Sequence, residues 1–259
     1  MQLAYKKYGT QGPVIVILHG LFGNSDNWMA IARKLESRFQ VYVPDQRNHG
    51  QSPWAETWNY EVMSQDLHEF LEAQQLSEVI LVGHSMGGKV AMWYAGQYAA
   101  EQRLRQLLIV DIAPRAYPVH HDHILDALLR LPLAQLRSRR EADEALAQYL
   151  PEADTRQFLL KNLQRNAQNQ FYWQVNLEVI HQNIEIVGAP FPANWQVGVP
   201  TLFMKGALSQ YIQEKDQAEI EVRFPQATLV SIPQAGHWVH AEQPEAFLQT
   251  LLQAIDGKP

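Results

Sequence analysis

Short runs of apolar residues, each ended by a polar or glycine-rich turn, recur along the chain. Runs rich in valine and isoleucine are typical of strands that are buried on both faces of a sheet. The first candidate alternates only weakly, which favours an edge strand. The pattern as a whole predicts strands at residues 3–8, 14–18, 41–43, 79–82, 107–110, 201–204 and 229–232.

Between these strands, apolar positions recur at the three- and four-residue spacing of helices. Residues 244–255 show this clearly, with a proline in the first turn and an apolar stripe of Phe247, Leu248, Leu251 and Leu252. Strands that alternate with helices predict a mostly parallel sheet covered on both faces. The expected helices of this kind are residues 28–35, 61–74, 89–100 and 244–255.

Residues 111–200 interrupt the alternation. Strand-like runs almost vanish there, and helical spacing predicts four segments, at residues 124–131, 141–149, 155–165 and 171–187. We therefore expect an α/β core made of residues 1–114 and 195–259. Residues 115–194 are expected to form a helical cap over one end of its sheet.

Composition narrows the class of protein. The 259 residues carry a net charge of −6, which disfavours a nucleic-acid-binding protein, and they include no cysteine, which excludes disulfides and thiol chemistry. The first seven residues lack the apolar stretch of a signal peptide, and no run approaches the ~18 apolar residues of a membrane span. A cytoplasmic protein without nucleic-acid or membrane partners is the expectation.

A possible catalytic motif lies between a predicted strand and a predicted helix. Residues 83–87 read G-H-S-M-G and match the G-x-S-x-G nucleophile elbow. Glycines on both sides of Ser85 are expected because side chains there would collide with the neighbouring elements. The elbow would expose the Ser85 hydroxyl at the tip of the strand, near the positive end of a helix dipole.

A serine nucleophile needs a base, and the base needs a carboxylate to orient it. In chains with this elbow the order is serine, acid, histidine. His237 follows the last predicted strand and is the expected base. Asp111, which ends the strand 107–110, is the favoured acid, with Glu214 and Asp216 as alternatives.

Two backbone N–H groups are needed for the oxyanion of the tetrahedral intermediate. One should come from Met86, the residue after the nucleophile. The other should come from the turn at residues 19–23, where Leu21 is favoured and Phe22 is the alternative.

Other polar clusters are weaker candidates. His240 is expected to be structural. The run H-H-D-H at residues 120–123 lacks the spacing of known binuclear metal sites, so a metal site there is disfavoured. The run R-S-R-R at residues 137–140 is followed at once by acidic residues, so a site for an anionic substrate is disfavoured there. Residues 45–52 are expected to pack beside the elbow.

Taken together, these motifs resemble the α/β-hydrolase family over essentially the whole chain. They are HGLFG at residues 19–23, GHSMGG at 83–88 and GHWVHAE at 236–242. SDNW at 25–28, DQRNHGQSP at 45–53, GHSMGGKVAM at 83–92 and DIAP at 111–114 resemble the YbfF-like bacterial esterases more closely. The resemblance implies an α/β-hydrolase fold with a helical cap inserted after its sixth strand, and an acid at Asp111.

The function this implies is a serine carboxylesterase that acts through an acyl-enzyme on a small acyl ester and needs no cofactor or metal. An acyl-CoA thioesterase and a carbon–carbon bond hydrolase would use the same residues. A binding protein that keeps the fold without turnover is the alternative of another class. Four apolar cap residues, Ile124, Leu125, Leu128 and Leu129, predict an apolar acyl pocket.

Overall fold

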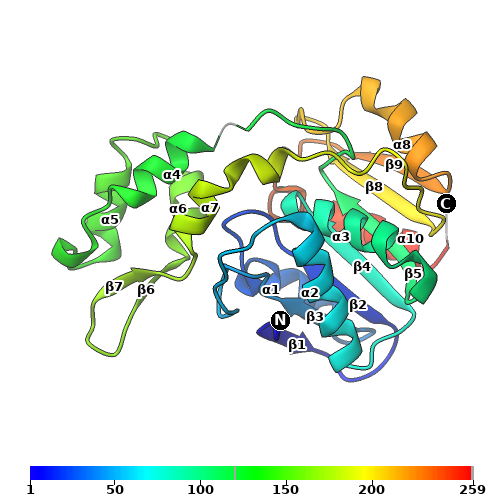
Figure 1. Cartoon of the computed structure of the whole chain (residues 1–259), viewed down its shortest axis with the longest axis horizontal. Helices are drawn as coiled ribbons and strands as arrows, with labels where there is room; N and C mark the ends of the chain where they lie inside the picture. Colours follow the sequence, from blue (N-terminus) through cyan, green and yellow to red (C-terminus); the bar gives the residue numbers. More distant parts are fainter. Residues whose placement is uncertain (120, 258–259) are drawn as a thin grey trace.

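The computed structural model describes residues 1–119 and 121–257. Its centre is a twisted sheet with the strand order β1-β3-β2-β4-β5-β8-β9 (Figure 1). β1 is antiparallel to β3, and the other neighbours are parallel. The strands are β1 (Tyr5–Tyr8), β2 (Val14–Leu18), β3 (Gln40–Pro44), β4 (Val79–His84), β5 (Leu104–Val110), β8 (Thr201–Gly206) and β9 (Ala227–Ile232).

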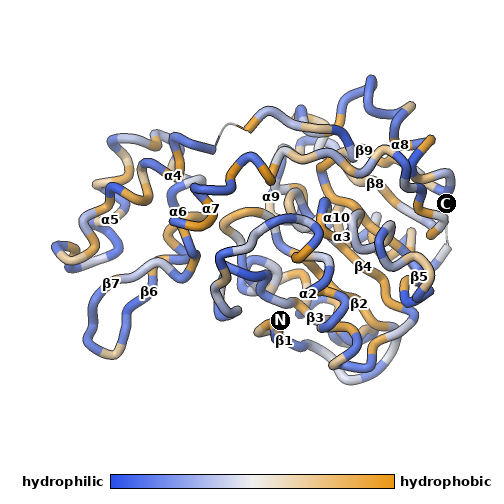
Figure 2. Tube along the Cα trace, in the orientation of Figure 1, coloured by the Kyte–Doolittle hydropathy of each residue, from blue (hydrophilic) through white to orange (hydrophobic). Residues whose placement is uncertain are grey.

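Every predicted strand is present, and the inner ones form because their apolar runs are buried from both sides. All six residues of β4 are buried, and Figure 2 shows the central strands as the most hydrophobic part of the chain. β1 lies at the sheet edge, as its weak alternation predicts. β9 is the other edge strand and is mostly exposed.

Helices cover both faces of the sheet. Side chains of α2, α3 and α8 belong to one apolar cluster, and side chains of α1 and α10 belong to a second on the opposite face. The helices are α1 (Met29–Leu35), α2 (Tyr60–Ala73), α3 (Met86–Gln97), α8 (Gln217–Arg223), α9 (Val239–Glu242) and α10 (Pro244–Ile255). Short 3₁₀ turns precede α1 at Ser25–Trp28, follow α3 at Ala99–Glu101 and precede α8 at Glu214–Asp216.

The inserted segment, residues 115–194, leaves the sheet after β5 and gathers at one end of the molecule (Figure 1). Along residues 1–119, β5 is the fifth strand, so the expectation that the insertion follows the sixth strand counted one strand too many. Whether the segment is a separate cap domain stays a prediction. Its elements are α4 (Asp122–Leu129), α5 (Arg139–Leu146), α6 (Ala153–Leu160), β6 (Leu163–Arg165), β7 (Phe171–Trp173) and α7 (Leu177–Gln182), with 3₁₀ turns at Leu133–Gln135 and Ile184–Gly188.

The helical prediction is wrong for residues 163–165, at the end of the segment 155–165, and for residues 171–173, at the start of the segment 171–187. These residues form the β6–β7 hairpin, closed by a turn in which Asn169 has φ 63°. Phe171 and Trp173 are buried while Tyr172 between them is exposed. That alternation has the period of a strand, and three residues are too few for it to stand out in the sequence.

Buried polar contacts tie the inserted segment to the core. Asn162 donates through Nδ2 to Phe22 O at 2.6 Å, and its Oδ1 accepts from Asn24 Nδ2 at 3.2 Å. Asn176 donates from its backbone to Asn48 O at 2.9 Å and from its side chain to Asn48 Oδ1 at 3.2 Å. Because these amides are buried, they hold the segment in one position on the core.

Lys89 of α3 connects the core to both ends of the inserted segment. Its fully buried ammonium group donates to three carbonyl oxygens, Pro114 O at 3.1 Å, Arg115 O at 2.6 Å and Ala189 O at 2.9 Å. The first two acceptors lie where the chain enters the inserted segment, and Ala189 lies where it returns. Both connections are therefore fixed to one side chain of the core.

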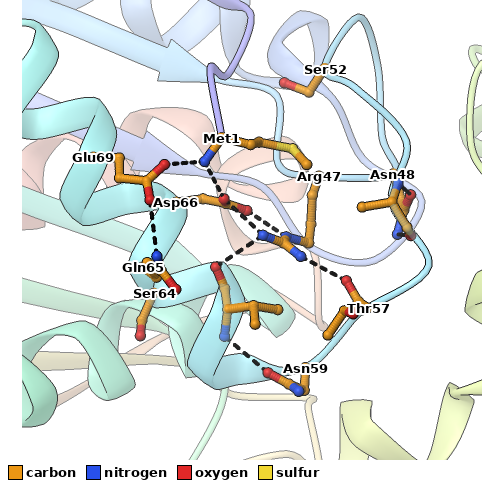
Figure 3. Close-up of polar contacts among 12 residues, drawn as sticks. Met1, Arg47, Asn48, Ser52, Thr57, Asn59, Ser64, Gln65, Asp66 and Glu69 are labelled. Atoms are coloured by element: carbon orange, nitrogen blue, oxygen red, sulfur yellow. Dashed lines mark hydrogen bonds and ion pairs between the residues drawn. The ribbon is translucent and has the colours of Figure 1, made fainter.

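The loop at residues 45–52 is held by charge as well as by packing (Figure 3). Arg47 pairs with Asp66 of α2 through two contacts of 2.5 and 2.8 Å, and it also donates to Thr57 O at 2.7 Å. Asp45 accepts from Ser25 N at 2.6 Å. The loop therefore forms a rigid support beside β2.

Among the described residues, no helix has the length and apolarity that crossing a bilayer requires.

Candidate active site

Ser85 lies at the sharp turn between β4 and α3. Its φ of 53° and ψ of −120° are strained for a residue with a side chain. A Cβ at Gly83 would lie 2.3 Å from Gly87 O, and a Cβ at Gly87 would lie 2.5 Å from Leu18 O. Both glycines of the motif are therefore required for the turn to close, as the sequence pattern predicts.

Asp111 and His237 form a pair, and His237 lines the same cavity as Ser85. The Oδ2 atom of Asp111 lies 2.7 Å from Nδ1 of His237, and the carboxylate is completely buried. Asp111 also accepts from Gly206 N at 3.0 Å and from the hydroxyl of Ser209. With Nδ1–H donating to Asp111, Nε2 of His237 is left as the proton acceptor.

The imidazole of His237 is held on further sides. The Tyr211 ring stacks on it with centroids 3.9 Å apart and planes 20° apart. Nε2 of His84 donates to the His237 carbonyl at 2.8 Å. Burial lowers the pKa of His84 well below its ordinary value, so His84 is a neutral hydrogen-bond donor there.

The alternative acids lie elsewhere. Asp216 pairs with Arg115 Nε at 2.8 Å and accepts from Gln213 N at 2.8 Å. Glu214 is exposed on the surface. The structure therefore brings Asp111 to His237, and it gives Glu214 and Asp216 other surroundings.

The predicted oxyanion loop, residues 19–23, lies directly against the elbow. A Cβ at Gly20 would be 3.2 Å from the Ser85 Cβ. The N–H of Phe22 donates to Nε2 of His49 at 3.3 Å, whereas the N–H of Leu21 has no acceptor among the described residues. Met86 occupies the first helical position of α3, where backbone N–H groups lack helical partners. Leu21 and Met86 thus present the donors on which the oxyanion prediction depends.

Phe22 fixes the shape of this loop. Its φ is 59°, and its peptide groups are held on both sides, by His49 at the N–H and by Asn162 at the carbonyl. Burial lowers the pKa of His49 to about 3, so its ring is neutral, with Nδ1 donating to Arg47 O at 2.9 Å and Nε2 free to accept. His19 packs against His49 with its pKa lowered to about 4 by burial.

Sequence reasoning missed these supporting residues. Ser209, His49 and Asn162 contact residues that are 98, 27 and 140 positions away in the chain. The only signal for His49 was its place in the polar run at residues 45–52, which the sequence assigned to packing alone. No local pattern pointed to Asn162.

A cavity of about 490 Å³ opens at Ser85. Rings dominate its lining, and its few charged side chains include Lys161 of the inserted segment. The aromatic residues that line it are Phe22, Trp28, Phe158, Tyr211 and Trp238.

The apolar pocket predicted from α4 is only partly correct. Ile124 lines the cavity. Leu125 and Leu128 are instead buried in the apolar cluster that also contains side chains of α2 and α3, and Leu129 is 41% exposed. A helix with apolar residues on successive turns presents them to several neighbours, and here two of them are used for packing.

The weaker candidates have structural surroundings. His240 is buried and stacks on Trp28 at 3.9 Å. Arg139 donates to Leu163 O at 2.7 Å, and Arg140 pairs with Glu144 on the surface. Of the run at 120–123, His120 lies outside the described residues. Among residues 1–119 and 121–257, no group of three or more histidine and acidic side chains could hold a metal ion.

Comparison with known proteins points in the same direction as the geometry. The family model described as alpha/beta hydrolase fold matches residues 13–244. The chain is 38% identical to the esterase YbfF of Escherichia coli, covering 93% of this chain and 92% of the relative. It is also 38% identical to the sn-1-specific diacylglycerol lipase ABHD11 of Mus musculus, covering 92% and 80%.

A solved structure is similar throughout. A marine microorganism esterase superposes with a TM-score of 0.93 at 42% identity, and the match covers 97% of this chain and 98% of that one. The inserted segment is included in a match of that extent.

Proposed function

The chain belongs to the α/β-hydrolase family, and we propose that it is a carboxylic ester hydrolase of the esterase and lipase type with Ser85 as its nucleophile. His237 is the base and Asp111 the carboxylate that orients it. The observation that carries the proposal is the 2.7 Å contact between His237 Nδ1 and Asp111 Oδ2 beside the strained elbow of Ser85. We further propose that residues 115–194 act as a cap over this site.

In the proposed reaction, His237 Nε2 takes the Ser85 hydroxyl proton while Oγ bonds to the ester carbonyl carbon. The resulting oxyanion is held by the N–H groups of Leu21 and Met86, each typically worth ~3 kcal/mol of barrier. The imidazolium then gives its proton to the leaving alkoxide, and the alcohol departs from the acyl-enzyme. Water, deprotonated by His237, repeats the sequence and releases the acid.

An ester fits the cavity better than an acyl-CoA thioester. Coenzyme A carries several phosphate charges, which proteins hold with clusters of arginine and lysine. Among the described residues that line the large cavity, Lys161 is the single lysine or arginine, and Asp154 and Glu242 are also present. The proposed substrate is therefore an uncharged or weakly charged ester.

The experiment that tests this proposal compares Ser85→Ala with the parent protein on p-nitrophenyl acetate. We expect release of p-nitrophenol by the parent and its loss in the variant, at least ~10³-fold in kcat. Ser37→Ala, a change at an exposed serine, is the matched control and should keep the parent rate. Equal rates for Ser85→Ala and the parent would refute the nucleophile, and stoichiometric ligand binding without turnover would favour a binding protein instead.

A further inference from the structure

Two cavities of very unequal size meet at Ser85. Beside the large cavity of about 490 Å³ lies a small one of about 30 Å³. Four residues line both cavities: Leu21, Ser85, His121 and Tyr211. The remaining wall of the small cavity is mostly apolar and includes Met86, Ile112, Val119, Val187 and Gly188.

The chemistry of ester cleavage assigns a side to each part of the substrate. The leaving oxygen must face His237, because His237 returns the proton to it. The acyl group must then lie on the other side of the carbonyl carbon. Among the described residues, His237 lines the large cavity and not the small one, whereas Met86, a proposed oxyanion donor, lines the small one. The large cavity is thus on the alcohol side and the small cavity on the acyl side.

We propose that the substrates of this protein are esters of a short carboxylic acid with a long or bulky alcohol, an inference that rests on the proposed esterase function. The acyl chain enters the small cavity beneath the inserted segment. The alcohol occupies the large aromatic cavity next to His237.

The volume of the small cavity limits the length of the acyl chain. A water molecule needs roughly 10–15 Å³, measured by the space that a water-sized group can occupy. A cavity of about 30 Å³ therefore accepts two or three such groups beyond the carbonyl. The acyl groups that fit are acetyl, propionyl and butyryl, with one, two and three carbons beyond the carbonyl, and longer chains exceed the space.

The walls of the small cavity are tied in place, so a longer chain cannot easily widen it. Gly188 O accepts from Tyr117 N at 2.9 Å, and a Cβ at Gly188 would lie 2.2 Å from Tyr117 O. Val187 O accepts from the Tyr60 hydroxyl at 2.8 Å. The Tyr117 hydroxyl donates to Tyr211 O at 2.5 Å and accepts from Ala113 N at 2.8 Å.

A pair of isomeric esters tests the orientation directly. Hexyl acetate and ethyl hexanoate have the same atoms and nearly the same hydrophobicity, but their short and long chains are exchanged. One methylene that fits badly changes specificity by about 10- to 200-fold. We expect kcat/KM for hexyl acetate to exceed that for ethyl hexanoate by at least ~10-fold.

The outcomes are distinguishable. Equal rates, or faster hydrolysis of ethyl hexanoate, would overturn the acyl-side assignment while leaving the esterase proposal intact, provided that Ser85→Ala abolishes both activities. If neither ester nor p-nitrophenyl acetate is hydrolysed in a Ser85-dependent way, the proposed function fails and this inference fails with it.

Enlarging the small cavity gives a second test. The double variant Val119→Ala/Val187→Ala removes side-chain volume from its wall and keeps the backbone contacts. We expect the preference for hexyl acetate to fall by ~10-fold or more, mainly through faster turnover of ethyl hexanoate. Ile124→Ala, which enlarges the other cavity, is the matched control and should not raise the rate with ethyl hexanoate. An unchanged ratio in a folded double variant would contradict the assignment.

Discussion

Three non-glycine residues at the site hold left-handed backbone conformations. Phe22 has φ 59°, Ser85 has φ 53° and Asp111 has φ 51°. Ser85 and Asp111 directly follow β4 and β5, and Phe22 lies in the loop after β2, where the chain turns to direct a peptide group or side chain toward the site. Such conformations cost of order 1–3 kcal/mol each and persist only where neighbours fix them. The hydrogen bonds on Phe22 and Asp111 supply that fixation.

Asp111→Asn is expected to lower kcat by around ~10⁴ because the amide would favour the wrong tautomer of His237. The measurement is p-nitrophenyl acetate hydrolysis, with circular dichroism to confirm folding. Asp216→Asn, at the carboxylate paired with Arg115, is the control and should retain most activity. Full activity in Asp111→Asn would move the acid role to Glu214 or Asp216.

Asn162→Leu is expected to act on the oxyanion loop from the inserted segment. Losing its donation to Phe22 O removes a hydrogen bond worth about 1 kcal/mol and frees the peptide beside the Leu21 donor. We expect kcat to fall by roughly 5- to 10-fold with KM little changed. Steady-state kinetics separate the two, and Asn194→Leu, at an exposed position, is the control. A rise in KM at constant kcat would instead indicate loss of substrate binding.

For single residues, the sequence predicts those whose role follows from a motif and from their order along the chain. Ser85 and His237 are recognisable because the elbow and the chain order restrict where they can lie. Ser209 and Asn162 are not, because any serine or asparagine in a loop has the same local appearance. Their roles come from distances that exist only after folding.

At the scale of elements, burial explains which predictions succeeded. Central strands give unbroken apolar runs, so β2, β4 and β5 are found directly from the sequence. The β6–β7 hairpin has strands of only three residues each, and a helical spacing fits those residues equally well. α3 is the element on which most depends, since Ser85 and Met86 lie at its start and Lys89 lies one turn later.

Lys89→Met is expected to destabilise the connections to the inserted segment. It leaves the carbonyl oxygens of Arg115 and Ala189 without their donor, at about 1–3 kcal/mol each, whereas Pro114 O still accepts from Phe191 N at 2.7 Å. The free energy of unfolding in urea should therefore fall by about 2 kcal/mol or more, and proteolysis should begin near residues 115–119 and 187–191. Lys34→Met, which breaks an exposed pair with Glu245, should change stability by less than ~1 kcal/mol. Equal stability of the two variants would contradict the role of Lys89.

At the scale of the whole molecule, three buried histidines near the site are uncharged in the folded protein. Burial lowers the pKa of His19 to about 4 and of His49 and His240 to about 3. These groups stay uncharged when folded but take up protons below pH 6.5 when unfolded. The unfolded state therefore binds more protons, so stability is complete above pH 6.5 and falls as the pH drops toward 4.

His49→Gln is expected to reduce this acid sensitivity. A pKa shift of one unit corresponds to ~1.4 kcal/mol, so His49 contributes roughly 3 kcal/mol to the loss of stability between pH 6.5 and pH 4. The measurement is the change in unfolding free energy over that range, compared between variant and parent at each pH. His123→Gln, at an exposed histidine, should keep the parent slope. A parent slope in His49→Gln would show that His49 is not the group that titrates.

The meeting of Tyr117 and Gly188 has a consequence for protein engineering. Tyr117 N and Gly188 O are 2.9 Å apart, so the two ends of the segment between them lie side by side. A segment of another length, taken from a different protein, could replace it at little extra cost, because the entropy lost on closing a loop grows slowly with its length. The carbonyl oxygens that accept from Lys89 belong to Pro114, Arg115 and Ala189, outside the exchanged residues, and would stay in place. The new segment would need to supply an amide that donates to Phe22 O, as Asn162 does. Grafting at these two residues would therefore exchange one pocket for another without rebuilding the sheet.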